Sequence, residues 1–461
     1  MKKQFTYTAI ILAAMTLTGC GETNTIFQMN ADTAVVGEKE KAVSPEPAEE
    51  FAGEEAKIAE EAADDCAPTD EAGVGIAAGD AEMRDAAAAD AALKTMDMEL
   101  APEKPADEPA EEPSDEPIKG AVVDTSKAFV LTAGEWNDNE NWGFFANLVH
   151  NDTISFPSYG LDPVNRIAVT VTNGGAPVRN QTVQLKAKDI LWTAKTDKNG
   201  MAYLFYDSAF AGSELTIETD DADAVSFTAP ADASGQGGRS VPVLEYTLET
   251  SAEAQSYSDT EVCFMLDTTG SMGDEITYLQ MDFAAIAEEV ARDGMTFSVN
   301  FYRDEGDAYV TRCNPFTDDV KSVQQALNQE YADGGGDTPE AVAEILDEVM
   351  TKGDWHENTN KIAFLIFDAP PHSGSEQENM ILNAVKAAAE QGIHVVPVVA
   401  SNADRETELF GRALSIMTDA NYVFLTDDSG VGESHLEPII GDYDVELLHD
   451  IIVRNINEIA G

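Results

Sequence analysis

Hydrophobic and polar positions follow two different periods along this chain. Between Arg166 and Glu249, short runs place an apolar residue at every second position, and turns such as "NGGAP" and "DKNG" separate the runs. Beyond Thr260, short runs that are apolar throughout alternate with longer segments whose apolar residues recur at helical spacing. A period of two is typical of half-buried strands, whereas buried strands alternating with helices are typical of a parallel sheet covered on both faces. The pattern therefore predicts a β domain followed by an α/β domain.

The β domain is expected over residues 162–250. Its strand runs are "RIAVTVTN", "QTVQLKAK", "ILWTAKTD", "MAYLFYD", "ELTIETD", "AVSFTAP" and "PVLEYTLE". Their short spacing predicts an antiparallel β-sandwich. The stretches "GGAPVRNQTVQLKAKD" and "TDKNGMAYLF" resemble the immunoglobulin-like, carboxypeptidase-regulatory-like repeats of bacterial surface proteins. We see no catalytic group in this region, so we expect a spacer or a secondary binding surface.

The α/β domain is expected over residues 259–461. Strands are predicted at 262–267, 297–303, 309–316, 362–368, 393–400 and 422–427. Helices are predicted at 276–293, 319–331, 339–352, 376–391, 406–419 and 444–460. This alternation predicts a central, mostly parallel sheet with helices on both faces. Ligands of such sheets bind outside the carboxyl ends of the strands.

The N-terminus has the pattern of a secretory leader. Two lysines precede the short apolar stretch "TAIILAAMTLT", and "LTGC" ends at Cys20. The apolar stretch is too short for a transmembrane helix, which needs about 20 residues. "LTGC" resembles the lipobox of bacterial lipoproteins, which implies a signal peptide over residues 1–19, a lipid on Cys20 and a membrane-anchored chain. Gly21 after that cysteine implies the outer membrane if the source has two membranes.

A long acidic segment, residues 20–120, separates the leader from the folded domains. Ala, Glu, Asp and Pro dominate it, and such a composition cannot bury enough apolar surface to offset its ordering entropy. We expect a disordered tether, with a low-affinity calcium buffer as the alternative. The whole chain has 27 Lys and Arg against 86 Asp and Glu, a formal net charge of −59, which disfavours nucleic acid as a partner. Residues 121–161, which contain clusters of Trp and Phe, are expected to fold.

Oxygen-bearing side chains follow two of the predicted strands. Asp267 ends one strand and begins a D-x-T-x-S motif with Thr269 and Ser271, and Asp368 ends another strand. Alternate positions in a loop that leaves a strand can turn to one side. A Gly-rich loop, Asp333–Ala341, precedes a later helix, and its glycines permit tight turns. Carboxylates and hydroxyls of this kind suit a hard divalent cation, Mg²⁺ first, with Mn²⁺ or Ca²⁺ as alternatives. The alternative interpretation is that Asp and Ser only form turns and cap the next helix.

From Asp259 to Ala460 the chain resembles a von Willebrand factor type A (VWA) domain, which has a Rossmann-like α/β fold. The D-x-T-x-S motif, the Gly-rich loop and the strand-terminal aspartate resemble that family's metal-ion-dependent adhesion site. The resemblance implies that Asp267 is the first aspartate, that Thr269 and Ser271 are hydroxyl ligands, and that Asp368 is the second aspartate.

The sequence does not decide which residue of the Gly-rich loop would be a metal ligand. The family takes a threonine from its Gly-rich loop, and here "GGGDTPE" offers Asp337 or Thr338. In the family, an acidic side chain of a protein partner completes the metal shell. The resemblance therefore implies a cell-envelope lipoprotein that binds a protein partner.

Other polar residues near the motif have two interpretations. The stretch Tyr302–Arg312 is expected to form a solvated hairpin turn, and the alternative is that Arg303, Asp304 and Asp307 form a binding rim. His372 is expected to be a loop histidine with ordinary hydrogen bonds, although it could approach the metal.

Two rival functions remain beside the binding module. One is an enzyme, but "TGSMG" has Thr269 where a nucleophile elbow needs glycine, and the chain lacks a P-loop and an H-E-x-x-H motif. We therefore expect no enzyme activity. The other is a structural envelope lipoprotein whose metal site is vestigial.

Three cysteines remain after Cys20. An exported chain could oxidise Cys66, Cys263 and Cys313, but Cys263 lies in an apolar strand and Cys313 near the end of another. We expect buried free thiols, and the sequence cannot decide any pairing.

Overall fold

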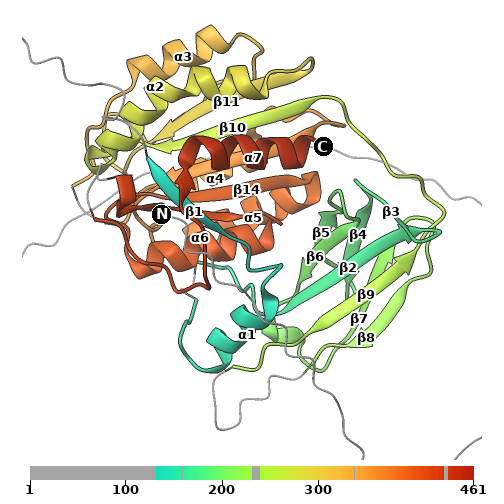
Figure 1. The fold of residues 1–461 in the computed structure, drawn as a ribbon. Coiled ribbons are helices and arrows are strands. Elements are labelled where there is room, and N and C mark those ends of the chain that lie inside the picture. Colours follow the sequence, from blue (N-terminus) through green and yellow to red (C-terminus); the bar gives the residue numbers. More distant parts are fainter. Residues whose placement is uncertain (1–130, 157–158, 231–238, 337, 430–433) are drawn as a thin grey trace, which may run out of the picture. The chain divides into compact units, whose positions relative to one another are not determined.

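The structure is a computed structural model that describes residues 131–156, 159–230, 239–336, 338–429 and 434–461 (Figure 1). The expected signal peptide, Cys20, Cys66 and the acidic tether lie outside the described residues, as does Asp337. The structure therefore tests none of the interpretations placed on them.

An eight-stranded mixed sheet organises the C-terminal half, with the strand order β12-β11-β10-β13-β14-β15-β1-β16. Its five central strands run parallel, and the outer strands β12, β1 and β16 pair antiparallel with their neighbours. The strands are β1 (Thr132–Trp136), β10 (Thr260–Asp267), β11 (Met295–Tyr302), β12 (Thr311–Arg312), β13 (Asn360–Phe367), β14 (Ile393–Val399), β15 (Tyr422–Thr426) and β16 (Glu446–Leu447). The expected mostly parallel sheet is present, but the predicted strand 309–316 shrinks to the two residues of β12.

Helices cover both faces of this sheet, as expected (Figure 1). They are α2 (Gly273–Val290), α3 (Val320–Gln329), α4 (Val342–Lys352), α5 (Ser375–Gln391), α6 (Arg405–Met417) and α7 (Leu448–Ala460). Side chains of β10 alternate between two buried clusters. Val262 and Phe264 pack in the cluster of α2, α3 and α7, whereas Cys263 and Met265 pack in the cluster of α4, α5 and α6. Strands buried on both faces explain the continuous apolar runs of the sequence.

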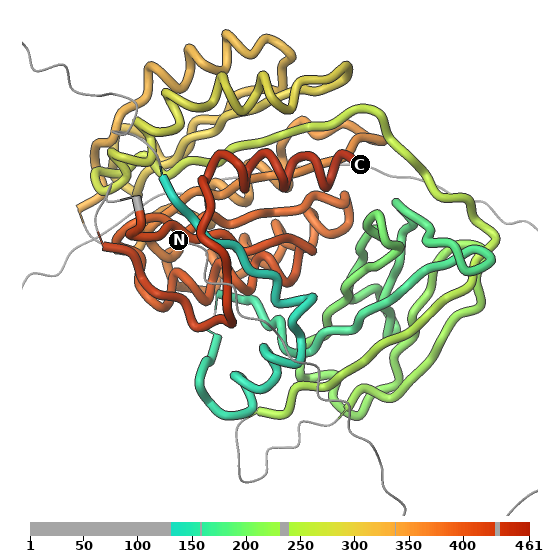
Figure 2. The backbone as a smooth tube through the Cα atoms, in the orientation of Figure 1, coloured from blue at the N-terminus to red at the C-terminus, as the bar shows by residue number. Residues whose placement is uncertain are grey.

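The segment before the β region supplies a strand to this sheet. β1 pairs antiparallel with β15, with Thr132 opposite Thr426, and also pairs with β16. Helix α1 (Trp142–His150) follows it. Between them, Asp138 accepts two hydrogen bonds from the guanidinium of Arg412 in α6, both at 2.8 Å, and both side chains are 0% exposed. The α/β part is therefore assembled from two stretches of chain that the β region separates, as the path in Figure 2 shows.

The β region, residues 166–249, forms two four-stranded sheets. One sheet has the order β3-β2-β6 with β9 also paired to β2, and the other has the order β5-β4-β7-β8. The strands are β2 (Arg166–Asn173), β3 (Ala176–Pro177), β4 (Thr182–Lys186), β5 (Ile190–Lys195), β6 (Met201–Phe205), β7 (Glu214–Thr219), β8 (Val225–Thr228) and β9 (Leu244–Glu249). Trp192 of β5 and Phe205 of β6 join the sheets through an edge-on ring contact at 5.1 Å. The immunoglobulin-like assignment of this region stays a prediction.

Two expectations need correction. The strand pairing is not purely antiparallel, because β9 runs parallel to β2 over residues 167–172 and 244–249. The long connection from β8, in the other sheet, lets β9 enter in this direction, since parallel neighbours require a crossover. The second correction concerns Cys313, which is a free and exposed thiol, whereas Cys263 is free and buried as expected. Cys313 follows the short edge strand β12, so no strand covers it.

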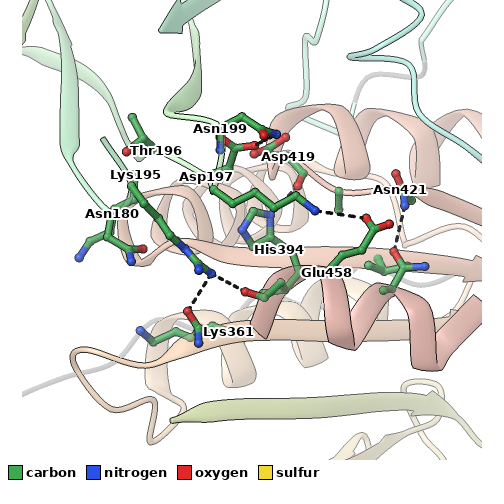
Figure 3. A pocket seen from close by; sticks show the side chains of 18 of the residues that line it. Asn180, Lys195, Thr196, Asp197, Asn199, Lys361, His394, Asp419, Asn421 and Glu458 are labelled. Carbon is green, nitrogen blue, oxygen red and sulfur yellow. Dashed lines mark hydrogen bonds and ion pairs between the residues drawn. The ribbon is translucent and has the colours of Figure 1, made fainter. Parts of the chain in front are cut away.

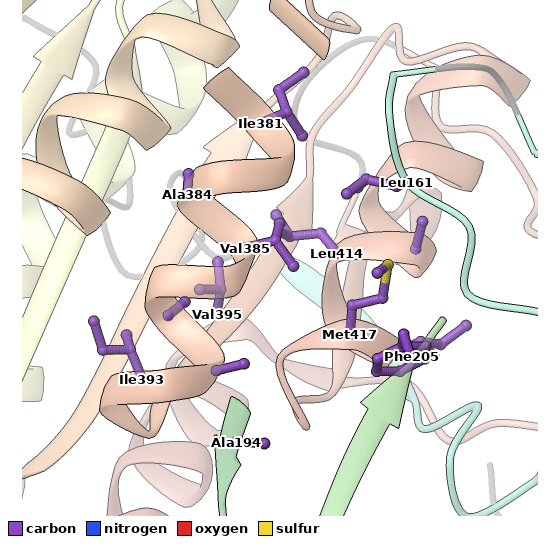
Figure 4. Packing of buried hydrophobic residues seen from close by; sticks show 14 of the residues in the cluster. Leu161, Ala194, Phe205, Ile381, Ala384, Val385, Ile393, Val395, Leu414 and Met417 are labelled. Carbon is purple, nitrogen blue, oxygen red and sulfur yellow. The ribbon is translucent and has the colours of Figure 1, made fainter. Parts of the chain in front are cut away.

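The β region packs on the α5–α6 side of the large sheet through a shared core. Ala194 of β5 and Phe205 of β6 belong to the same buried cluster as Leu414 and Met417 of α6 (Figure 4). Arg166 of β2 stacks on Trp142 of α1, with its guanidinium carbon 3.7 Å from the ring centre. The two parts therefore share apolar packing and do not meet only through a linker. Among the described residues, no helix is both long and apolar enough to cross a membrane.

Replacing Asp138 with alanine should lower the free energy of unfolding by about 3 kcal/mol, because the buried guanidinium of Arg412 loses its two-point partner. Urea denaturation followed by tryptophan fluorescence would measure the change. Lys352→Ala, which breaks an exposed pairing with Asp347 and Glu348, is the control and should have no comparable effect. Equal stability of the two variants would show that the Asp138–Arg412 pair does not hold β1 in place.

Candidate functional site

Two aspartates lie at the carboxyl edge of the large sheet. Asp267 is the last residue of β10, and Asp368 directly follows β13. These strands are parallel neighbours, with Leu266 opposite Ile366, so both carboxyl groups are brought to the same edge. Asp267 is 0% exposed and Asp368 is also buried.

The loop after β10 folds back on Asp267. Oδ1 of Asp267 accepts hydrogen bonds from the backbone N–H of Thr269 at 2.9 Å and from its hydroxyl at 2.7 Å. A single 3₁₀ turn, Gly270–Met272, then leads into α2. Ser271, in this turn, is exposed and donates a hydrogen bond to Asp368. The other oxygen of Asp267, Oδ2, is buried and makes no hydrogen bond of good geometry, although the hydroxyl of Tyr302 is close enough to lower the pKa of this carboxyl group.

An open cavity of about 420 Å³ lies above this loop. Thr269, Ser271, Thr338 and Asp368 line it, together with Glu340 and the glycines Gly334–Gly336. Asp267 lies directly beneath, bonded to Thr269. Six residues were predicted as metal ligands. The structure brings five of them together: Asp267, Thr269, Ser271, Thr338 and Asp368. The sixth, Asp337, is outside the described residues, so the choice between Asp337 and Thr338 stays open.

The Gly-rich loop approaches the motif closely because it has no side chains there. Gly334 and Gly335 have φ angles of +82° and +67°, in the left-handed region that favours glycine. A Cβ on Gly335 would come within 2.9 Å of Oε1 of Glu340. The N–H of Gly335 donates to Oδ2 of Asp307 at 2.8 Å. Asp307 therefore orients the loop, a role that the rim interpretation did not include.

The predicted hairpin Tyr302–Arg312 is present, closed by the hydrogen bond from the N–H of Arg303 to the carbonyl of Val310. It is not fully solvated, because Arg303 and Asp304 are buried. His372 bonds through Nε2 to Asp304 at 2.6 Å, which matches the expected ordinary loop histidine.

The side chain of Arg303 supports the loops from within. Its guanidinium donates to Glu330 at 3.2 Å and to the carbonyl of Tyr331 at 2.8 Å, and it lies over the rings of Tyr309 and Tyr331. Because these contacts occupy a buried side chain, Arg303 is a structural residue and not an exposed part of a rim.

Sequence reasoning assigned no role to Glu340. This residue is buried, and its Oε2 has no hydrogen-bond partner. Burial raises the pKa of Glu340 to about 9, with further contributions from the charges of Asp267, Asp304 and Asp368. The position of Glu340 directly after the glycines could have indicated that it lies near the site, since that loop folds over the motif. Tyr302 was missed as well, although it is the residue opposite Asp267 in the β10–β11 register.

Both aspartates of this site have raised pKa values. Burial raises the pKa of Asp267, the charge of Asp368 raises it further, and the hydrogen bonds from Thr269 act in the opposite direction. Burial also raises the pKa of Asp368, while the hydrogen bond from Ser271 favours its ionised form. Carboxylates that lie close together with little solvent are stabilised by binding either a proton or a cation.

The donor set suits a hard divalent cation. It combines two carboxylates with hydroxyl oxygens, and the unpartnered Oδ2 of Asp267 leaves an acceptor without a donor. Within the described residues, no group of three or more His, Cys, Asp and Glu side chains is placed to hold a metal ion. Among the described residues, a cation here would combine the two aspartates with hydroxyl oxygens.

Parts of this chain are similar to known proteins. An ariadne-like RING finger protein of Acanthamoeba polyphaga mimivirus is 25% identical over 210 residues, which cover 41% of this chain and 20% of that protein. The chain thus spans about one fifth of the length of that relative. The crystal structure of BatB from Bacteroides thetaiotaomicron is 18% identical and aligns with 44% of this chain and 98% of that one, with a TM-score of 0.32.

The family comparison covers the stretch that holds the site. Residues 261–433 match the model of the von Willebrand factor A domain, and they contain β10 to β15 together with both aspartates and the Gly-rich loop. The described part of this chain therefore contains a von Willebrand factor A domain.

Proposed function

We propose that the VWA domain is a binding module that holds a divalent cation and recognises a protein partner through it. VWA domains commonly bind protein partners. The observation that carries the proposal is the carboxylate of Asp267, which is fully buried beneath a lined cavity with one oxygen unpartnered. A buried carboxylate without compensation is costly, and a cation provides that compensation.

The roles of the residues follow from their positions. Asp267 and Asp368 would supply charged oxygens, while Thr269 and Ser271 would supply neutral ones. Thr338 or Asp337 would add a ligand from the Gly-rich loop. Mg²⁺ fits this small set of oxygen ligands best, because it keeps several water molecules, and Mn²⁺ or Ca²⁺ are the alternatives. When bound, the cation supplies a positive charge and an open position for an acidic side chain of the partner.

A binding role is better supported than an enzymatic one. A nucleophile elbow would activate Ser271, but this hydroxyl bonds to Asp368, and the ring of His372 bonds to Asp304. A purely structural lipoprotein with a vestigial metal site is the alternative. It would keep the fold but lose the metal dependence of partner binding.

We also propose that the chain is anchored to the cell membrane by a lipid on Cys20, in the outer membrane if the source has two membranes. The support is the leader pattern that ends in "LTGC" and the acidic segment that follows it. Such a segment extends by self-repulsion, so it would hold the VWA domain away from the lipid surface and free to meet a partner.

Titration of the metal-free protein with Mg²⁺, Mn²⁺ and Ca²⁺ by calorimetry should reveal one saturable site, and Asp267→Ala should weaken it by at least about tenfold, or about 1.4 kcal/mol. Asp274→Ala is the control, because Asp274 is an exposed acid in the first turn of α2. Pull-down of partners from envelope extracts should then fail with EDTA and with Asp267→Ala. Metal binding that is unaffected by Asp267→Ala would contradict the assignment of the site.

The stability of the metal-free protein should fall as pH rises from about 4.5 to about 9, because folded Glu340 binds a proton over this range and the unfolded residue does not. Glu340→Gln should flatten this fall, as should saturating Mg²⁺. Thermal unfolding at several pH values in EDTA measures the effect. Glu305→Gln, at an exposed position of the hairpin, should leave the profile unchanged, and an unchanged profile in Glu340→Gln as well would refute the buried-acid account.

Replacing Cys20 with alanine should move the protein from the membrane fraction to the soluble fraction of lysed cells, because the acceptor of the lipid is lost. Mass spectrometry of the mature N-terminal peptide should show a lipid-modified cysteine in the wild type. Cys66→Ala is the matched control and should stay with the membrane. Membrane association of both variants would exclude a lipid anchor at Cys20.

A further inference from the structure

A second polar cavity lies at the opposite end of the large sheet, where the β region meets the starts of β13, β14 and β15. Its volume is about 120 Å³. Figure 3 shows Lys195, Thr196 and Asp197 of the β region facing Lys361 and His394 of the α/β part. Lys361 is the second residue of β13, whereas Asp368 follows the last residue of that strand. The cavity is therefore roughly 25 Å from the candidate metal site, given the rise of a strand per residue.

Basic side chains are as numerous as acidic ones in the lining of this cavity, four of each, although the whole chain is strongly acidic. Arg179, Lys195, Lys198 and Lys361 line it, and acids outnumber bases by 86 to 27 in the whole chain. Lys198 pairs with Glu458 at 3.8 Å, and both side chains are largely exposed. No ion pair joins Arg179, Lys195 or Lys361 to a carboxylate among the described residues. These three cations of the lining thus form no direct ion pair within the described part of the chain, and Arg179 and Lys361 feel nearby carboxylates, Asp197 and Glu261, only at longer range.

Of these three cations, Lys361 gives the strongest argument for a bound anion, because it is buried. The residue is 5% exposed, and its Nζ donates to the carbonyl of Thr359 at 3.2 Å. The nearest acid in the sheet is Glu261, its neighbour across β10 and β13. That carboxylate already accepts hydrogen bonds from His356, at 3.0 Å and 2.6 Å, and from Thr359, at 2.6 Å. A buried ammonium group that is not bonded directly to an anion is costly. Burial accordingly lowers the pKa of Lys361, and the charge of Glu261 acts in the opposite direction.

Arg179 also presents charge without compensation. Its guanidinium donates to Oδ1 of Asn360 at 2.9 Å and to the carbonyl of Ile459. Both acceptors are neutral oxygens, so the positive charge is oriented but not balanced. These bonds connect the β region to β13 and α7. They hold the guanidinium of Arg179 beside Lys361, although the two residues are far apart in the sequence.

The acidic side chains of the lining form no ion pair with Arg179, Lys195 or Lys361. Asp197 is engaged in its own turn, where it accepts from the N–H groups of Asn199 at 2.8 Å and Met201 at 2.7 Å. Burial raises the pKa of Asp419 well above its usual range. Glu140 is exposed, and Glu458 pairs with Lys198.

We propose that this cavity is a binding site for a small anion with a carboxylate or phosphate group, held by Lys361, Arg179 and Lys195. The cavity has the volume of a few water molecules and is well below the size of a pocket for a nucleotide or a drug-sized ligand. The anion would balance charges from both the β region and the α/β part. Its binding would therefore stabilise the contact between them, independently of the metal site.

The test is thermal unfolding of the full mature chain in EDTA at constant ionic strength, with chloride replaced stepwise by inorganic phosphate or by acetate. One or both anions should raise Tm with a saturable dependence on concentration, because a ligand of the folded state stabilises it. A response to phosphate, to acetate or to both identifies the preferred group.

Lys361→Gln should weaken the anion's apparent affinity by about tenfold or more. Lys321→Gln, which removes the same charge from an exposed position in α3, is the control and should respond like the wild type. Lys195→Gln provides a second, partly exposed probe if Lys361→Gln fails to fold, and Mg²⁺ titration of each variant checks the distant metal site. The proposal is overturned if neither anion gives a saturable shift, or if Lys195→Gln and Lys361→Gln respond like Lys321→Gln.

Discussion

The burial of one carboxylate at the end of a central strand shapes the whole carboxyl edge of the large sheet. Asp267 is enclosed by parallel neighbours on both sides and by the loop that follows it. Its charge cannot be hydrated, so the chain surrounds it with donors from Thr269. The second aspartate and Glu340 add further acid where solvent is scarce. Several buried acids in one place are costly for the folded chain, and this cost is the physical basis of our proposal that the site binds a cation.

The two ends of β13 have opposite electrostatic character. Asp368 follows its last residue and faces an acidic cavity, while Lys361 near its first residue lines a cavity with several bases. The β region covers only the second end, and its residues contribute Arg179 and Lys195 there. The edge with the two aspartates carries the open cavity, where we propose that a partner binds. The β region covers the other edge, around three bases that form no direct ion pair with any described residue.

The α/β part depends on a segment that lies before the β region in the sequence. β1 extends the sheet beside β15, and the buried pair of Asp138 and Arg412 fastens it to α6. A chain that leaves the sheet after β1 and returns at β10 must hold the β region close to it. This explains the continuous apolar cluster that joins the two parts (Figure 4). It also means that a fragment beginning near residue 259 would lack a strand of its own sheet.

The residue pattern predicts the local elements and the chemistry of one edge of the large sheet. Apolar periodicity specified the helices and strands beyond Thr260, because burial on one or two faces leaves a direct record in the residue pattern. The order of motif, Gly-rich loop and strand-terminal aspartate located the candidate site, since parallel strands bring their carboxyl ends together. The folded chain alone shows the place of β1, the parallel pairing of β9, the burial of Arg303 and the convergence of Lys361 with Arg179. These features depend on contacts between residues far apart in the chain, and no local pattern encodes which distant segments meet.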